Sequence, residues 1–328
     1  MGMGMVPEPA LVERFARDLD ALSAPDLRLG IAVSGGPDSL ALLLLAASAR
    51  PGLVEAASVD HGLRAESRAE TEMVADLCRQ LGVAHAILTI AWAEPPATAI
   101  QERARAARYD LLADWVSNRA LDGLITAHHA DDQAETLVMR LNRGSGVRGL
   151  AGMRPAAIVP GSTIPLLRPL LGWRRAELDT ICDTAGLTPV VDPSNADEQY
   201  ERIRVRRALS EAEWLDPQAI GRSAAYLASA DAAIDWATGQ EWDRDVTVGD
   251  GHIAYRPSAA PAEIVRRIVT RAVTGLAHEG SGEAVRGREL EPVIAALEAG
   301  RTATLRGVLC TGGKEWRFSQ APARKTGL

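Results

Sequence analysis

The sequence contains little lysine, few aromatic side chains and few cysteines. Only two lysines occur, so nearly all of the positive charge is carried by arginine. Cys78, Cys182 and Cys310 are widely separated and form no CxxC pair, which excludes common zinc spacings and a disulfide framework and favours a cytoplasmic location. The longest apolar run, residues 40–47, is too short to span a bilayer, and no secretory signal is evident at the start of the sequence.

Length and apolar content favour two domains with well-formed cores. The chain has 328 residues, and 47% of them are hydrophobic. The net charge of −7 argues against a nucleic-acid partner for the chain as a whole. The charge is uneven, however, because residues 140–207 contain eleven arginines and seven acidic residues. This basic segment is typical of an RNA-binding surface, although a general use of arginine in place of lysine would also produce it.

Strand-like and helix-like runs alternate over the first 190 residues. This alternation predicts an α/β fold in which a parallel sheet is covered by helices on both faces. The expected strands are residues 29–33, 54–59, 86–90 and 124–127, and the expected helices are 39–49, 67–82, 98–120, 131–141 and 173–185. Residues 144–169 are rich in Gly and Pro, and we expect a loop with little regular structure there.

The pattern changes near residue 210, where we place a domain boundary. Residues 1–210 form the expected nucleotide-binding domain, and residues 211–328 form a smaller, mainly helical domain. Its expected elements are helices at 216–242, 261–276 and 290–299 and a short hairpin at 304–318.

The segment VSGGPDS (33–39) joins the first expected strand to the first expected helix. Its glycines allow backbone amides to approach an anion, and the positive end of the following helix points to the same place. It lacks GxxxxGK(S/T) and GxGxxG, so it is not a Walker A loop, and a dinucleotide fold is disfavoured. Asp38 would repel a phosphate unless Mg²⁺ bridged the two. An ordinary tight turn with Asp38 as a helix cap is the alternative.

Polar side chains follow the ends of three expected strands. Ser34 follows the first, Asp60 and His61 follow the second, and His128 follows the fourth. Because ligands of parallel sheets bind beyond the carboxyl ends of the strands, we expect these residues to meet in one crevice.

Five stretches carry a resemblance to a known family. They are SGGPDS (34–39), VDHGLR (59–64), ERARAARY (102–109), AHHADDQAETLVMRLNRGSGVRGLAGM (127–153) and DPSNADEQYERIRVR (192–206). The first resembles the loop of the ATP-pyrophosphatase, or PP-loop, superfamily. Together and in this order they resemble the tRNA(Ile)-lysidine synthase family over about residues 28–210. One departure is Ile203, which stands where asparagine is frequent in the family.

The resemblance implies an ATP-dependent ligase that modifies a tRNA. Its implied substrates are ATP with Mg²⁺, L-lysine and a tRNA(Ile) with a CAU anticodon; no membrane is involved, and a homodimer is left open. The wobble cytidine O2 would attack the α-phosphate and release pyrophosphate, and the lysine ε-amine would then attack C2 and expel AMP. Residues 1–210 would be a catalytic domain of the adenine nucleotide alpha hydrolase type, and residues 211–328 would bind tRNA.

The resemblance also assigns residues to roles. Asp132 and Glu135 are three apart on one helix face, where paired carboxylates suit the lysine cation; an acidic first helical turn favoured by the helix dipole is the alternative.

The implied catalytic residues are Asp38, Arg105, His128, Asp132 and Glu135. The implied nucleotide-binding residues are Ser34, Gly35, Gly36, Pro37, Asp38, Ser39, Asp60 and His61, with Asp38 also on the metal. The implied substrate-binding residues are Asp132, Glu135, Arg143, Arg148 and Arg204. Because of Ile203, which arginine meets the lysine carboxylate and which meets the tRNA stays open.

Three other functions compete with this one. A PP-loop thiolase needs cysteines near the nucleotide, and none of the three cysteines lies in a suitable loop. An ammonia-using synthetase is disfavoured because no glutaminase domain is attached. A nucleotide-binding module without catalysis would keep the glycine loop but would not need Asp132 and Glu135.

Overall fold

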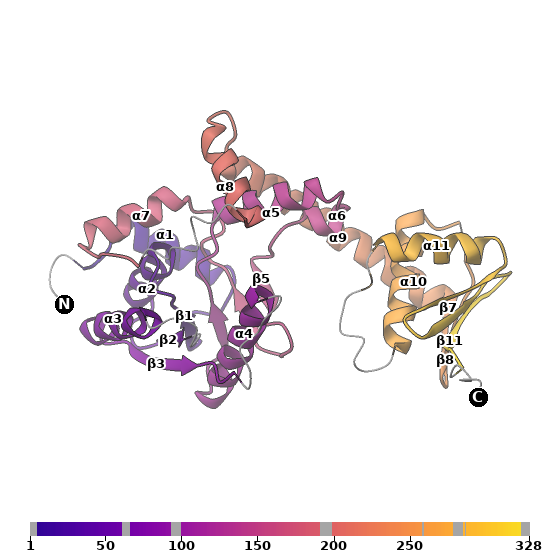
Figure 1. Ribbon diagram of the computed structural model, residues 1–328, viewed down its shortest axis with the longest axis horizontal. Helices are drawn as coiled ribbons and strands as arrows, with labels where there is room; N and C mark the ends of the chain where they lie inside the picture. Colours follow the sequence, from indigo (N-terminus) through magenta and orange to yellow (C-terminus); the bar gives the residue numbers. More distant parts are fainter. Residues whose placement is uncertain are drawn as a thin grey trace. The chain divides into compact units, whose positions relative to one another are not determined.

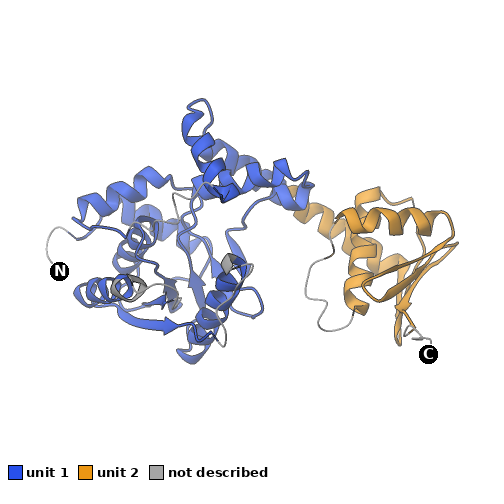
Figure 2. Cartoon of the chain, in the orientation of Figure 1, with its two compact units in different colours: residues 1–228 blue, residues 229–328 orange. Residues whose placement is uncertain are grey.

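The computed structural model describes residues 5–60, 66–92, 100–190, 199–257, 259–277, 285 and 287–322. Contacts within the chain define two compact units, unit 1 at Met1–Ala228 and unit 2 at Ser229–Leu328 (Figure 2). Within the described part of the chain, no helix combines the length and the apolar character that crossing a membrane requires.

Unit 1 is built on a six-stranded sheet (Figure 1). Its strands are β1 (Leu29–Ala32), β2 (Val54–Asp60), β3 (Ala84–Thr89), β4 (Gly123–Ile125), β5 (Ala156–Ile158) and β6 (Pro165–Leu167). Their order is β3-β2-β1-β4-β6-β5. All neighbours are parallel except the edge strand β5, which is antiparallel to β6. The predicted parallel α/β fold is therefore confirmed.

The expectation of little regular structure at residues 144–169 was wrong. This segment contains the short helix α6 (Val147–Leu150) and strands β5 and β6. β6 pairs with β4 and thereby continues the main sheet beyond the fourth predicted strand. Each of the two strands has only three residues, so no periodic pattern could mark them in the sequence.

Helices cover both faces of this sheet, and alternate residues of β1 show how. Leu29 and Ile31 belong to the core on one face, and Ala32 packs into the core on the other. Gly30 faces Trp115, whose ring carbon would lie 2.5 Å from a Cβ at this position. The first core is completed by α1 (Pro9–Asp20), α2 (Pro37–Ala49), α3 (Glu66–Leu81) and α7 (Arg175–Thr184), and the second by α4 (Ile100–Asn118).

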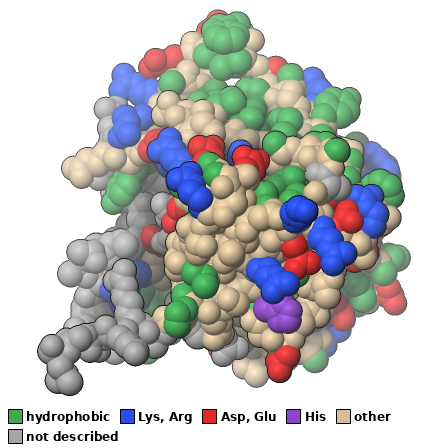
Figure 3. All heavy atoms as spheres, turned by 90° about the vertical axis from the view of Figure 1, so that its right-hand side faces the viewer, with side chains coloured by type: hydrophobic (Ala, Val, Ile, Leu, Met, Phe, Trp, Pro, Cys, Tyr) green, Lys and Arg blue, Asp and Glu red, His purple; other side chains and the backbone are tan. Residues whose placement is uncertain are grey.

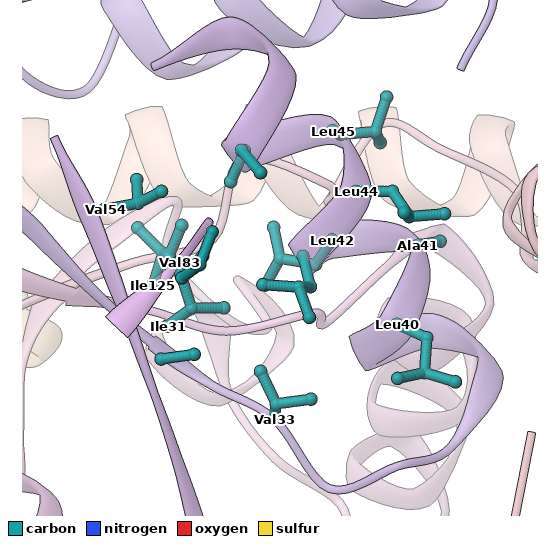
Figure 4. Packing of buried hydrophobic residues seen from close by; sticks show 14 of the residues in the cluster. Ile31, Val33, Leu40, Ala41, Leu42, Leu44, Leu45, Val54, Val83 and Ile125 are labelled. Carbon is teal, nitrogen blue, oxygen red and sulfur yellow. The ribbon is translucent and has the colours of Figure 1, made fainter. Parts of the chain in front are cut away.

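Helix α2 is buried on all sides. Its residues Leu40–Ala46 are fully buried, because the helix contacts α1 and α7 as well as β1 and β2. Figure 4 shows its leucines against Ile31, Val33 and Ile125 of the sheet. This packing fixes the start of α2, and with it the glycine loop, at the carboxyl edge of the sheet.

Three further helices follow the core strands. Helix α5 (Ala130–Asn142) begins after β4, and α8 (Glu201–Glu211) packs against it. Helix α9 (Pro217–Asp245) then runs from unit 1 into unit 2.

In its described residues, unit 2 contains a five-stranded antiparallel sheet, the second half of α9 and two further helices. The strands are β7 (Val246–Gly249), β8 (His252–Tyr255), β9 (Thr302–Leu305), β10 (Val308–Thr311) and β11 (Trp316–Gln320), in the order β7-β8-β11-β10-β9. Helices α10 (Ala262–Leu276) and α11 (Gly287–Glu298) share its core. The predicted hairpin corresponds to β10 and β11 within this larger sheet. The face drawn in Figure 3 shows acidic and basic side chains intermixed.

Candidate active site

The glycine loop leaves β1 and enters α2 in a conformation that its residue types permit. Gly35 has a φ of +83°, in the left-handed region that favours glycine. Gly36 is the N-cap of α2, and Pro37 starts the helix, where its missing N–H and fixed φ cost nothing. The carbonyl of Gly35 accepts a hydrogen bond from Val190 N at 3.0 Å. The free backbone amides at the start of α2 can therefore face an anion.

Two serines hold this loop together. Ser39 Oγ donates to the carbonyl of Gly36 at 2.9 Å and accepts from Ser34 N at 3.1 Å. The two hydroxyl oxygens lie 3.2 Å apart. Ser39 thus links both ends of the turn and fixes the backbone amides in place. Ser34 lies at the end of the strand.

A pocket of about 360 Å³ opens at this loop. It brings together the end of β1, the start of α2, one face of α4, the end of β4, the start of α5 and one face of α8. Its polar and charged lining residues are Ser34, Asp38, Ser39, Arg105, Arg108, Thr126, His128, Asp132, Arg202 and Arg206. Carboxylates, guanidinium groups and a phosphate-type loop therefore share one cavity, as expected at this edge of a parallel sheet.

Asp38 presents a carboxylate suited to a cation. Its Oδ1 is buried and has no hydrogen-bond partner among the described residues, and His129 Nε2 lies 3.5 Å away. An oxygen of this kind is the ligand that Mg²⁺ prefers. No group of three or more His, Cys, Asp or Glu residues in the described part of the chain could hold a metal by itself. Asp38 is thus a single carboxylate ligand that a cation could use at this site.

His129 supplies a positive charge beneath the pocket. Burial alone would lower its pKa, but Asp131, Asp38 and Asp132 outweigh burial and raise that pKa to about 10. The ring is therefore a cation at neutral pH. In that state Nδ1 carries a proton and cannot accept from Asp132 N. The contact that remains at the start of α5 is the Asp132 carboxylate, which accepts a hydrogen bond from His129 N at 3.2 Å. His129 is the N-cap residue of α5, which therefore begins one residue before the expected start at residue 131.

His128, unlike His129, is neutral at physiological pH. Burial, with the charges of Arg168, Arg105, Arg108 and Arg202, lowers its pKa to about 3. The ring is held by Thr126, whose Oγ1 lies 2.9 Å from Nδ1. The imidazole on the pocket wall is therefore neutral at physiological pH and only weakly basic, so it suits a hydrogen bond to a ligand rather than proton transfer.

The Asp132 and Glu135 carboxylates are paired with two arginines of α8. Arg202 Nε donates to Glu135 at 2.7 Å, and Arg206 Nε donates to Glu135 at 2.6 Å. Arg202 Nη2 also donates to Asp132 at 3.0 Å. Asp132 lines the pocket, whereas the buried Glu135 does not. Both carboxylates stand on one helix face, but only Asp132 reaches the cavity directly.

Other expected site residues lie elsewhere. Arg143 pairs with Glu201, and Arg204 is exposed and donates to the carbonyl of Gln199 at 3.0 Å. Arg148, on α6, is exposed. None of these three arginines lines the pocket. Asp60 ends β2 and is also absent from the lining. His61 lies outside the described residues.

Sequence reasoning missed several residues of this pocket. Arg108, Arg202 and Arg206 line it but were not assigned to the site, and neither was His129 beneath it. Arg202 and Arg206 are four apart, which is the spacing that places two side chains on one helix face. That signal could have been used only if residues 201–211 had been recognised as a helix.

Comparisons with known proteins agree with this geometry. A PP-loop domain family model matches residues 11–213. A tRNA(Ile)-lysidine synthase from Novosphingobium aromaticivorans is 48% identical over 99% of this chain and 98% of its own length. A tRNA(Ile)-lysidine synthase from Zymomonas mobilis is 42% identical over 98% of this chain and 96% of its own length.

A solved structure supports the fold alone. The U34-tRNA thiolase NcsA from Methanococcus maripaludis superimposes with a TM-score of 0.55 at 16% sequence identity. The match covers 67% of this chain and 78% of the thiolase chain.

Proposed function

We infer that the chain, which belongs to the tRNA(Ile)-lysidine synthase family of PP-loop proteins, is an ATP-dependent ligase that makes lysidine at the wobble cytidine of a tRNA(Ile) with a CAU anticodon. The observation that carries the proposal is that the PP-loop, the acidic Asp132 and a wall of arginines line one pocket. Such a pocket can hold a polyphosphate and a cationic amine side by side.

The reaction joins three substrates in two steps. In the first, cytidine O2 attacks the α-phosphate of ATP, and pyrophosphate leaves. In the second, the lysine ε-amine loses a proton, attacks C2 of the activated base and expels AMP. The products are lysidine, AMP and pyrophosphate.

We propose that the loop at residues 34–39 binds the phosphates. The amides at the start of α2 and the Ser34 hydroxyl offer donors, and Arg105 lies on the pocket wall, where it can neutralise charge that develops on the α-phosphate. Mg²⁺ bound by Asp38 would supply charge neutralisation between the carboxylate and the phosphates. Asp38 Oδ1, which accepts no hydrogen bond from the described residues and has only the more distant His129 ring beside it, supports this assignment.

We propose that Asp132 attracts the lysine ε-ammonium. The Asp132 carboxylate on the pocket wall can also accept the proton that the amine must lose before attack, whereas His128, whose pKa burial and neighbouring arginines lower to about 3, is too weak a base for that step and is proposed to contact the nucleotide. Glu135 does not line the pocket and acts indirectly, by positioning Arg202 and Arg206, whose guanidinium groups it binds.

We propose that tRNA is bound by both units. Arg143, Arg148 and Arg204 are exposed on unit 1 and suit phosphate contacts that position the anticodon arm. Unit 2, which contains most of the predicted domain at residues 211–328, is proposed to bind the rest of the tRNA.

A thiolase function has less support. Cys78, Cys182 and Cys310 are the only cysteines of the chain, and all three are buried. Burial raises the pKa of Cys78 and Cys182 to about 12 and that of Cys310 to about 11. Thiols of this kind are poor nucleophiles and poor metal ligands.

The deciding experiment measures incorporation of radiolabelled L-lysine into unmodified tRNA(Ile) with a CAU anticodon, in the presence of ATP and Mg²⁺. The proposal predicts label in the tRNA that depends on ATP and an equal yield of AMP. A methionine tRNA with the same anticodon serves as the control RNA. Cleavage of ATP without label in the tRNA would mean that the nucleophile or the RNA is wrong.

A further inference from the structure

Glu135 is enclosed by two arginines, Arg202 and Arg206. Its side chain is only 2% exposed, and both of its oxygens accept hydrogen bonds from guanidinium groups. Arg202 also binds Asp132, and Arg206 lies 4.0 Å from it. Two guanidinium groups and two carboxylates therefore form one compact cluster, and the cationic His129 also lies 3.5 Å from Asp132.

Arg202 and Arg206 each contact both the carboxylates and the pocket. On one side they hold Glu135 and Asp132, and on the other they line the pocket beside Ser34 and Asp38. The planar guanidinium group can bind two phosphate oxygens at once. A polyphosphate on the glycine loop would therefore compete with the carboxylates for Arg202 and Arg206.

This competition sets the charge that a lysine side chain meets. While both arginines neutralise the carboxylates, an incoming ammonium gains no net attraction. Once phosphates share the arginines, Asp132 and Glu135 lose part of their counter-charge and attract the ammonium. Coulomb interactions of this kind are strong because the cluster is partly buried.

Helix α8 is suited to such an exchange. None of its eleven residues is buried, and its main neighbour is α5, which carries the two carboxylates. The ion pairs to Asp132 and Glu135 are therefore a large part of what holds the helix. Side chains so anchored can change partners without disturbing a hydrophobic core.

We propose that Arg202 and Arg206 are positioning residues shared by the two small substrates. They hold Glu135 and Asp132 in the substrate-free protein and turn toward the phosphates when ATP binds, which opens the carboxylates to lysine. The nucleotide therefore binds first, and lysine binds tightly only afterwards. This inference rests on the proposed function, because ATP and lysine are its substrates.

The test is isothermal titration calorimetry of the full chain with L-lysine. Titrations are made with and without saturating α,β-methylene-ATP and Mg²⁺, since this analogue cannot release pyrophosphate. We expect the analogue to lower the Kd of lysine by about tenfold or more, which lies within the usual range of coupling between two sites. By linkage, lysine must tighten binding of the analogue by the same factor.

The variant Arg206→Gln separates this role from a structural one. Removing one guanidinium leaves the carboxylates with excess negative charge, so lysine should bind about threefold or more tighter than in the wild type without nucleotide. The analogue should then improve lysine binding by less than about threefold. A merely structural role would weaken lysine binding rather than strengthen it. Arg207→Gln, on the same helix but paired with Glu211 and absent from the pocket, should behave as the wild type.

Each remaining outcome has a definite meaning. Equal lysine affinity with and without the analogue in the wild type overturns this inference and leaves the proposed function intact. Weaker lysine binding by Arg206→Gln in both states also overturns it, because Arg206 would then be a lysine ligand or a structural residue. No lysine binding in any state contradicts the proposed function and the inference together.

Discussion

Asp38 is the single residue whose chemistry depends most on a bound cation. A carboxylate in a phosphate site is repulsive unless a metal separates the charges. We predict that Asp38→Asn lowers ATP-dependent pyrophosphate release by about hundredfold or more, because the neutral amide is a much weaker ligand for a cation than the carboxylate. Asp76→Asn, an exposed carboxylate on α3 paired with Arg79, is the control. Full pyrophosphate release by Asp38→Asn would show that Asp38 does not bridge metal and phosphate.

His128 should make the stability of the protein depend on pH. Its pKa in the folded chain is lowered to about 3, whereas an unfolded histidine titrates near 6.5. Between these values the unfolded chain binds more protons than the folded one. The stability that neutral His128 contributes is therefore complete above pH 6.5 and is lost as pH falls toward 3.

The measurement compares the wild type with His128→Gln by urea denaturation at pH 7.5, 6.0 and 5.0. Below pH 6.5 the wild type should lose about 1.4 kcal/mol per pH unit relative to the variant. Other acidic groups titrate in both proteins and cancel in the difference. Parallel stability curves would contradict the low pKa of His128.

At the scale of the elements, strand β1 packs against helix α4 at Gly30, where the packing leaves no room for a side chain. A Cβ at Gly30 would lie 2.5 Å from a ring carbon of Trp115, which is 6% exposed. We predict that Gly30→Ala destabilises unit 1 by about 1–3 kcal/mol through overpacking. Gly221→Ala, on α9 with nothing within 4 Å of the added Cβ, should instead stabilise by about 0.5–1 kcal/mol. Denaturant unfolding of both variants checks the pair, and equal effects would refute the packing argument.

The sequence predicted the elements that carry their signal locally. β1, the glycine loop and α2 occupy one continuous stretch, and the alternation of runs sufficed to place Ser34, Asp38 and His128 near one edge of a parallel sheet. All three line the pocket. The loop needs glycine at a positive φ and small hydroxyl residues nearby, so its chemistry can be recognised from composition alone.

Contacts between distant elements could not be predicted in this way. Arg202 and Arg206 meet Glu135 across more than sixty residues of chain, and α8 was not expected because it has no buried residues and hence no apolar period. The start of α5 was expected one residue late because its N-cap, His129, is not a residue type that usually marks a helix start. Both errors concern interactions that depend on the tertiary fold.

At the scale of the whole molecule, the proposed function gives the two units different tasks. Every residue that lines the nucleotide pocket lies in unit 1, between positions 32 and 206. Unit 2 has its own core, formed by its antiparallel sheet and helices α10 and α11. The proposed binding of tRNA by unit 2 therefore predicts that damage confined to unit 2 spares nucleotide binding.

Arg267 allows this separation to be tested. It is 8% exposed and joins α10 to the unit 2 part of α9 through Asp231 and Asp235, each at 2.7 Å. Arg267→Met would leave Asp231 buried without this cation, which should cost unit 2 about 3–5 kcal/mol. We predict weaker binding of tRNA(Ile) in filter-binding assays but an unchanged Kd for α,β-methylene-ATP.

The matched control is Arg256→Gln, which removes an exposed ion pair with Glu315 in the same unit and should cost less than about 1 kcal/mol. Its tRNA affinity should stay close to that of the wild type. Calorimetric unfolding of Arg267→Met would verify that unit 2 is the destabilised part. If tRNA binding survives this destabilisation, the arginines of unit 1 suffice for recognition. If Arg267→Met weakens nucleotide binding as much as tRNA binding, the two units do not act separately. The pocket in unit 1 would then depend on the integrity of unit 2, although no described residue of unit 2 lines it.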